Sequence, residues 1–311
     1  MSDRLTVGGQ AVIEGVMMRG PGVTATAVRT PEGRIEVEKK NINSISDRFP
    51  VLKKPFLRGT VALIESLVIG IRSLSYSAKM AGEEDEQLSD KEMAGTIIFA
   101  LVLASILFIA IPTGAAKLFH GVTDDPVFLN LMEGALRLLI FLAYIWGISR
   151  MKDIRRVFQY HGAEHKTIRC YEAKLPLTVE NVRPMTRFHP RCGTSFLFVI
   201  MILSILLFTI LSEVLLLIFP GLSVLRTEKK LLYNLLMLVI KIVIMLPLVV
   251  SVGYEFNRVV GRHDNWLTRA LTAPGLWLQR LTTNEPDDSM IEVAIEALTL
   301  VIPEKEGADK W

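Results

Sequence analysis

The chain has 311 residues, of which half are hydrophobic, and its mean hydropathy is +0.39. This composition argues against an ordinary soluble protein and favours a membrane protein. The formal net charge of +3 is too small to indicate a nucleic-acid-binding protein, and two cysteines are too few for a disulfide framework.

Residues 1–92 are predicted to form an N-terminal cytoplasmic region. Two alternating segments, VTATAVRT and RIEVEKKN, flank the turn sequence PEG and predict a β-hairpin. From residue 56 to residue 80 the pattern becomes helical and apolar, but charged residues interrupt it. We therefore expect a helix that packs on this region or lies in the membrane interface, and not a membrane span. The start, MSDRLTVGGQ, lacks the pattern of a secretory signal.

Four later runs are long enough to cross the hydrocarbon core of a bilayer, which takes roughly 20 apolar residues. They are residues 93–111, 129–149, 195–219 and 231–252, which place transmembrane helices 1 and 2 in 93–149 and helices 3 and 4 in 195–252. Basic residues follow the second and fourth runs and are frequent in the N-terminal region, as expected for cytoplasmic segments. We predict a multi-pass protein of the bacterial inner membrane with both termini in the cytoplasm.

The remaining segments are a cytoplasmic loop at 150–194 and a cytoplasmic tail at 253–311. In the tail, the sequence NEPDDSMIEVAIEALTLVI has acidic residues at its start and apolar residues at helical spacing, which predicts an amphipathic helix. The fold class is thus a mainly α membrane protein with four transmembrane helices. Its mixed α/β cytoplasmic head is assembled from the N-terminal, central-loop and C-terminal segments.

The loop contains the sequence YHGAEHKTIR. If this segment is helical, His161 and His165 are about 40° apart around the helix axis, and Glu164 lies about 60° to the other side. Two imidazoles one turn apart can bind one Zn²⁺, and the adjacent carboxylate can activate water, as in the H-x-x-E-H pattern. Gly162 weakens the helix prediction.

A second motif, FHPRCGTS, precedes the third run. His189 and Cys192 would add an imidazole and a thiolate, which suits a tetrahedral nitrogen and sulfur site on the same side of the membrane. Two other interpretations stay open. The histidines and basic neighbours such as Lys166 could contact an anion or lipid phosphates without metal, or the motif could be structural polar packing with Cys192 as a small buried residue.

Two further stretches could complete a site. The sequence GGQAVIEGVMMRGPG places Glu14 in an apolar run, where a carboxylate needs a cation such as Arg19 or a metal. An ion pair between Arg19 and Glu14 that stabilises a tight loop is an equal alternative. After the fourth run, GYEFNRVVGRHDN offers Glu255 as a second carboxylate at the same membrane face.

The sequences GGQAVIEGVMMRGP, YHGAEHKTI, HPRCGTSF and GYEFNR occur in one order, and together they resemble the YqhQ-like family of bacterial membrane proteins. That family is a domain of unknown function, sometimes described as a predicted metal-dependent enzyme. The resemblance covers almost the whole chain and implies functional positions at Glu14, His161, Glu164, His165, His189, Cys192 and, more weakly, Glu255.

We therefore expect a membrane-embedded, zinc-type hydrolase that acts at the cytoplasmic membrane surface, on a lipid-linked or membrane-protein substrate. His161, His165 and either His189 or Cys192 would be ligands, and Glu164 or Glu14 would be the general base. The main rival is a non-enzymatic assembly or scaffold factor, whose closed structural site would use all four ligands. A transporter is disfavoured because the spans contain few polar groups.

Overall fold

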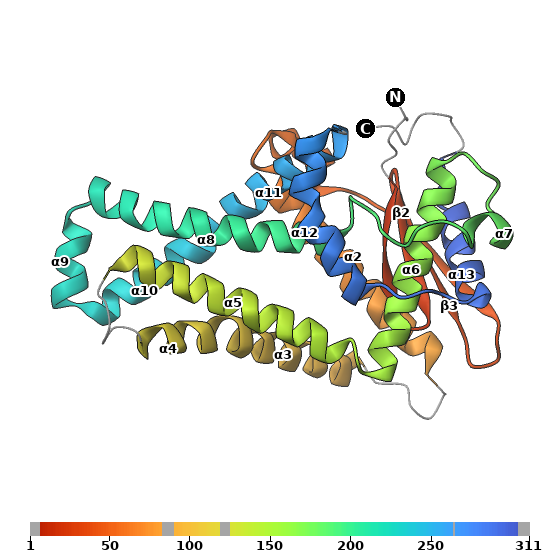
Figure 1. The fold of residues 1–311 in the computed structure, drawn as a ribbon, viewed down its shortest axis with the longest axis horizontal. Helices are drawn as coiled ribbons and strands as arrows, with labels where there is room; N and C mark the ends of the chain where they lie inside the picture. The colour runs from red at the N-terminus through yellow and green to blue at the C-terminus, as the bar shows by residue number, and fades with distance from the viewer. Residues whose placement is uncertain (1–6, 83–89, 119–124, 264, 304–311) are drawn as a thin grey trace.

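The computed structural model describes residues 7–82, 90–118, 125–263 and 265–303. It consists of a head that contains a small β-sheet and of an elongated arm of helices that extends from one side of the head (Figure 1). The first strand and the last helix both belong to the head. The described ends of the chain therefore lie at the same end of the arm.

The sheet is an antiparallel meander with strand order β1-β2-β3-β4. Strands β3 (Val23–Arg29) and β4 (Ile35–Asn41) form the predicted hairpin, with Ala27 opposite Val37. Strands β1 (Gly8–Val12) and β2 (Gly15–Gly20) were not predicted, and they contain the run GGQAVIEGVMMRG. That run is therefore a second hairpin of the sheet and not a free loop.

Helices cover both faces of the sheet. On one face, α6 (Lys152–Glu172) packs against β1 and β2, and the predicted C-terminal helix α13 (Asp288–Thr299) packs against β2 and β3. On the other face, Ile69 and Tyr76 of α2 (Arg58–Ala81) pack against Val12, Met17 and Val28. The helix expected between residues 56 and 80 thus packs on the head, because apolar residues of β1, β2 and β3 lie on both sides of the sheet.

Short elements connect these layers. They are α1 (Ile45–Arg48), the 3₁₀ helix η1 (Pro50–Lys53) and α7 (Val179–Val182). Helix α12 (Trp266–Thr282) lies between the arm and the sheet and packs against the start of α8 (Figure 1). It begins with a capping box between Asn265 and Thr268, which satisfies backbone groups that would otherwise lack partners.

Two π-helical turns interrupt the long helices of the arm. These arm elements are α3 (Asp90–Ser105), the π turn η3 (Ile106–Ala110), α4 (Ile111–Lys117), α5 (Pro126–Ile148), α8 (Gly193–Ile218), α9 (Gly221–Glu228), α10 (Lys230–Ile240), the π turn η5 (Lys241–Met245) and α11 (Leu246–Arg262). Arg137 of α5 donates from Nε to the carbonyl oxygen of Phe108 in η3 and pairs with Glu133 at 2.6 Å, as its four-residue spacing predicts.

Four helices of the described chain are long and apolar enough to cross a membrane: Arg58–Ala81, Ala94–Ala116, Phe128–Ile148 and Val243–Val260. Three of them overlap predicted runs. The third predicted run, residues 195–219, corresponds to α8, which contains the shorter apolar stretch Phe196–Leu207. Helix α2 qualifies by length and composition although it packs against the sheet. The structure is thus compatible with a membrane protein.

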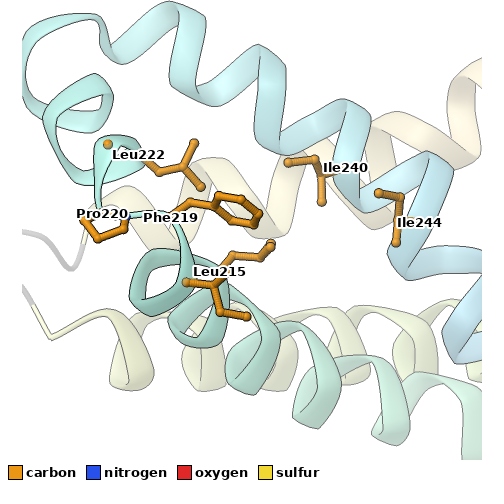
Figure 2. A pocket seen from close by; sticks show the side chains of 8 residues that line it. Leu215, Phe219, Pro220, Leu222, Ile240 and Ile244 are labelled. Atoms are coloured by element: carbon orange, nitrogen blue, oxygen red, sulfur yellow. The ribbon is translucent and has the colours of Figure 1, made fainter.

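A hollow of about 660 Å³ lies at the far end of the arm, where α8, α9 and α10 meet (Figure 2). Its lining consists of Leu215, Ile218, Phe219, Pro220, Gly221, Leu222, Ile240 and Ile244. None of these side chains can ionise or bind a metal ion, so the chemistry of the protein has to be sought in the head.

Candidate metal centre

Helix α6 carries three of the predicted site residues on the face expected from the sequence. Gly162, which weakens the helix in isolation, has a packing role. A Cβ atom at this position would lie 2.0 Å from the carbonyl oxygen of Asn284. The missing side chain lets the segment after α12 pass directly across α6, which brings Thr282 next to His161.

Each histidine of α6 is fixed by a backbone carbonyl group. Nδ1 of His161 lies 2.8 Å from the oxygen of Thr282, and Nδ1 of His165 lies 2.5 Å from the oxygen of Arg187. A carbonyl oxygen can only accept a hydrogen bond, so Nδ1 carries the proton in both rings. In the neutral rings, Nε2 keeps its lone pair and can bind a metal ion.

Cys192 completes a cluster of three ligands. It is the N-cap residue of α8, and its Sγ lies 3.2 Å from Nε2 of His161. The ligand atoms of His161, His165 and Cys192 all lie within 4.8 Å of one another, and the three residues are largely or fully buried. Two imidazoles and one thiol form a donor set that suits Zn²⁺ or another divalent transition metal.

Glu164 is the carboxylate next to this cluster. Its Oε2 lies 4.0 Å from Nε2 of His161 and makes no hydrogen bond among the described residues. Burial raises the pKa of Glu164 to about 8, although nearby His161 and the backbone N–H of Gly9 act in the opposite direction. Nε2 of His165 is also buried without a hydrogen-bond partner in the described chain. A cation would satisfy both atoms, so the residues fit a metal ion.

The ionisation of the two inner ligands also favours metal binding. Burial, together with the charge of His161, lowers the pKa of His165, so its ring is neutral at pH 7. Burial opposes ionisation of the Cys192 thiol. However, its interactions with His165 and Thr194 are stronger and leave the pKa of Cys192 below its usual value. A neutral imidazole and an easily ionised thiol are the forms that bind metals.

His189, which was predicted as a ligand, lies beside the cluster but is not part of it. Its ring centroid is 5.6 Å from that of His165, and its Nε2 is 3.3 Å from a carboxylate oxygen of Glu172. Burial and the charge of Arg169 lower the pKa of His189 to about 3. Because its Nε2 points to Glu172 and its Nδ1 accepts the N–H of Arg191 at 3.4 Å, the four-ligand set is not formed.

Glu14 and Arg19 do not pair with each other. Glu14 lies in the turn between β1 and β2 at a positive φ of 49°, and it forms an ion pair with Arg156 and accepts a hydrogen bond from Tyr160. Arg19 lies 3.6 Å from Glu65 of α2. The cation that Glu14 needs is therefore Arg156, and this pair holds the β1–β2 turn against α6, one turn before His161.

Two other predicted residues, Glu255 and Lys166, form ion pairs away from the cluster. Glu255 of α11 pairs with Arg58 of α2 through two hydrogen bonds of 2.6 and 2.5 Å. Lys166 is buried, pairs with Glu285 at 2.6 Å and donates to the carbonyl oxygen of Arg183 at 2.9 Å. These partners occupy both charged groups, and they separate Glu255 and Lys166 from the cluster.

The residues that orient the cluster and its surroundings were not predicted. The loop with His189 is held by Gln279 of α12, which accepts the His189 N–H at 2.8 Å and donates to the His189 carbonyl oxygen at 2.7 Å. Gln279 is fully buried. The only signal in the sequence was a polar residue on the inner side of an amphipathic helix, and backbone carbonyls such as that of Thr282 leave no signal.

The fold and the site define a mainly α-helical protein with an apolar helical arm and a head that contains a His/His/Cys cluster. Residues 54–304 match a family described as protein of unknown function, DUF1385. The chain is also 35% identical over 306 residues to the uncharacterized protein YqhQ of Bacillus subtilis (strain 168), which covers 93% of this chain and 90% of that protein. The chain therefore belongs to the DUF1385 family. No solved structure gives a significant match.

Proposed function

We propose that the chain is a metal-dependent hydrolase of the zinc type that acts at the cytoplasmic surface of the bacterial inner membrane. The observation that carries this proposal is the cluster of His161, His165 and Cys192, whose ligand atoms lie within 4.8 Å of one another beside the buried carboxylate of Glu164. Three protein ligands leave one tetrahedral position open, as in catalytic zinc sites, whereas structural sites use four.

The residues of the cluster have separate roles. His161, His165 and Cys192 would hold the ion, and the carbonyl groups of Thr282 and Arg187 orient the two imidazoles. A divalent metal bound there would supply Lewis-acid activation of water. Glu164 would accept the proton of the attacking water and return it to the leaving group.

The position of the cluster supports a substrate at the membrane. Cys192 immediately precedes α8, whose residues 196–207 form a shorter apolar stretch, so one ligand lies where a helix predicted from the sequence to cross the membrane begins. A substrate that is linked to lipid or is part of a membrane protein would reach this level without leaving the bilayer surface. A free metabolite would gain nothing from this placement.

Metal analysis tests the proposal. The full chain is purified without chelators as wild type, as a His161→Ala/His165→Ala variant and as the control His263→Ala, which removes an exposed histidine outside the cluster. We expect about one equivalent of metal in wild type and control and none in the double variant. Equal absence of metal from all three preparations would refute metal binding.

A second variant tests hydrolysis. Glu164→Gln keeps the three ligands and should retain metal, but it should lose the cellular function that depends on the gene. If Glu164→Gln retains both metal and function, the general-base role is wrong.

One observation favours the scaffold alternative, in which the metal is structural and the helices bind other membrane proteins. The relative exposure of His165 is 1% and that of Cys192 is 8%, so the cluster is enclosed in the structure. In that case, crosslinked membrane-protein partners should persist in Glu164→Gln and be lost only in the double histidine variant. Loss of function in Glu164→Gln with partners retained would favour the hydrolase.

A further inference from the structure

Helix α12 has two faces of different character. Its inner face packs on α8 and holds the buried residues Thr268, Gly275, Leu278, Gln279 and Thr282. Its opposite face, which we call the outer face, carries the exposed residues Trp266, Arg269, Trp277 and Arg280. Trp266 and Trp277 are 79% and 55% exposed and lie eleven residues apart, about three turns, on one side of the helix.

A tryptophan side chain is rarely exposed to water to more than half of its surface, because its ring has a large apolar area. A third tryptophan shows the same exposure: Trp146, near the end of α5, is 53% exposed, with the guanidinium of Arg150 4.5 Å from its ring centroid. Every tryptophan in the described part of the chain is therefore more than half exposed. Helix α12 lies between the arm and the sheet (Figure 1), and Trp146 is two residues before the end of α5. Arg150, Arg269 and Arg280, which are close to these tryptophans in the sequence, are exposed.

We propose that the outer face of α12 binds the headgroup layer of an anionic phospholipid membrane. Tryptophan is enriched where headgroups meet hydrocarbon, and amphipathic helices with aromatic and basic residues lie in that plane. Arg269 and Arg280 match the negative charge of anionic lipids. The helix follows α11, which overlaps the candidate span Val243–Val260, and packs on α8, which contains the apolar stretch Phe196–Leu207, so it lies next to apolar helices of the arm.

The inner face of the same helix contacts the candidate metal centre. Thr282 accepts the hydrogen bond of His161, and Gln279 clamps the backbone of His189. The cluster thus lies about one helix diameter, roughly 10 Å, from the headgroup layer. This inference rests on the membrane location in the proposed function and not on the metal. It narrows the class of substrate to molecules whose reacting group lies at the level of the lipid headgroups.

Fluorescence quenching tests the inference with the full chain in nanodiscs. Three variants each retain one tryptophan, at 146, 266 or 277, and replace the others by Phe. The discs contain phosphatidylcholine and phosphatidylglycerol, with bromine placed either near the headgroup or deep in the acyl chain. Acrylamide reports access from water. If the protein does not insert into the discs, the membrane location in the proposed function is wrong. That outcome can be distinguished from a failure of the inference, in which the protein inserts but the outer face of α12 stays in water.

We expect shallow bromine to quench the emission of Trp266 and Trp277 strongly, and deep bromine to quench it weakly. Acrylamide quenching should fall several-fold on transfer from detergent to discs. If the protein inserts but both residues stay fully accessible to acrylamide and insensitive to bromine, the inference is wrong. Protection that depends on the number of chains per disc would assign the face to a second copy of the protein and would also overturn it.

A charge variant tests the lipid class. Arg269→Gln/Arg280→Gln should lower the enrichment of phosphatidylglycerol over phosphatidylcholine in lipid that copurifies with the protein. The matched control, Lys39→Gln/Lys40→Gln, removes the same charge from exposed positions on strand β4 and should leave the enrichment unchanged. Equal enrichment in both variants would refute recognition of anionic lipid.

Discussion

Replacement of Glu164 by Gln should stabilise the metal-free head, and the gain should grow with pH. The pKa of Glu164 is raised from 4.5 to about 8, mainly because the side chain is buried. Between these two values, the native state keeps a proton that the unfolded state has lost. Stability therefore falls as pH rises through this window, which is the opposite of the behaviour of a salt-bridged carboxylate.

The magnitude follows from the size of the shift. One pKa unit corresponds to about 1.4 kcal/mol, so Glu164 should cost less than about 1 kcal/mol near pH 5 and about 4 kcal/mol near pH 8. Glutamine has nearly the same shape and does not ionise, so the variant avoids this cost. The difference between about pH 5 and pH 8, about 3 kcal/mol, is a factor on the order of a hundred in the equilibrium for local opening.

Hydrogen exchange measures this effect in the detergent-solubilised, chelator-treated chain. The protection of amides in α6 is compared between variant and wild type at each pH, so that the pH dependence of chemical exchange cancels. We expect the ratio to rise by on the order of a hundredfold from about pH 5 to pH 8. A constant ratio would refute the reasoning, because a lost hydrogen bond alone would not depend on pH. With metal bound, Glu164→Gln should be less stable than wild type, because the cation favours the ionised carboxylate of Glu164.

Three further substitutions probe the surroundings of the cluster. Gln279→Leu leaves the His189 N–H without a partner and removes the shorter of the two hydrogen bonds to the His189 carbonyl oxygen, so it should cost about 2–4 kcal/mol. It should also weaken Co²⁺ binding, which is followed by the thiolate charge-transfer absorption. Gly162→Ala forces Cβ against the carbonyl of Asn284 and should cost several kcal/mol in thermal unfolding, whereas a gain would show that the packing is loose. Arg58→Met breaks the ion pair with Glu255 and should lower the free energy of unfolding by about 1–3 kcal/mol. The metal content should stay at the wild-type level, and a loss of metal would link Glu255 to the site.

The sequence predicted the elements that depend only on residues close together along the chain. The β3–β4 hairpin follows from alternation around a turn. The common face of His161, Glu164 and His165 follows from their spacing once the segment is taken as a helix, which the structure shows it to be. The second hairpin was missed because glycines and a continuous apolar run hide the alternation of β1 and β2. Both faces of that hairpin are covered, and buried strands lack a polar side.

The partners of the predicted charges could not be derived from the sequence. Glu14 is 142 positions from Arg156, and Glu255 is 197 positions from Arg58. The packing of helices on the sheet decides such pairs, because each arginine within reach competes for the same carboxylate. His189 illustrates the same limit. Its spacing to Cys192 suited a metal site, but in the structure its Nε2 lies 3.3 Å from a carboxylate oxygen of Glu172.

The alternatives to a metal site differ in what they require of the buried atoms. An anion site needs cationic groups that face the cluster, yet Lys166 is held by Glu285, and Arg187 donates to the carbonyl oxygen of Thr283. Structural polar packing requires that buried polar atoms find partners, because each unsatisfied atom costs about 1–3 kcal/mol. Oε2 of Glu164 and Nε2 of His165 have none among the described residues. His165 belongs to the cluster with Cys192, and Glu164 lies beside it. Such an arrangement costs stability when empty and gains it with a cation, which favours a metal site over the two alternatives.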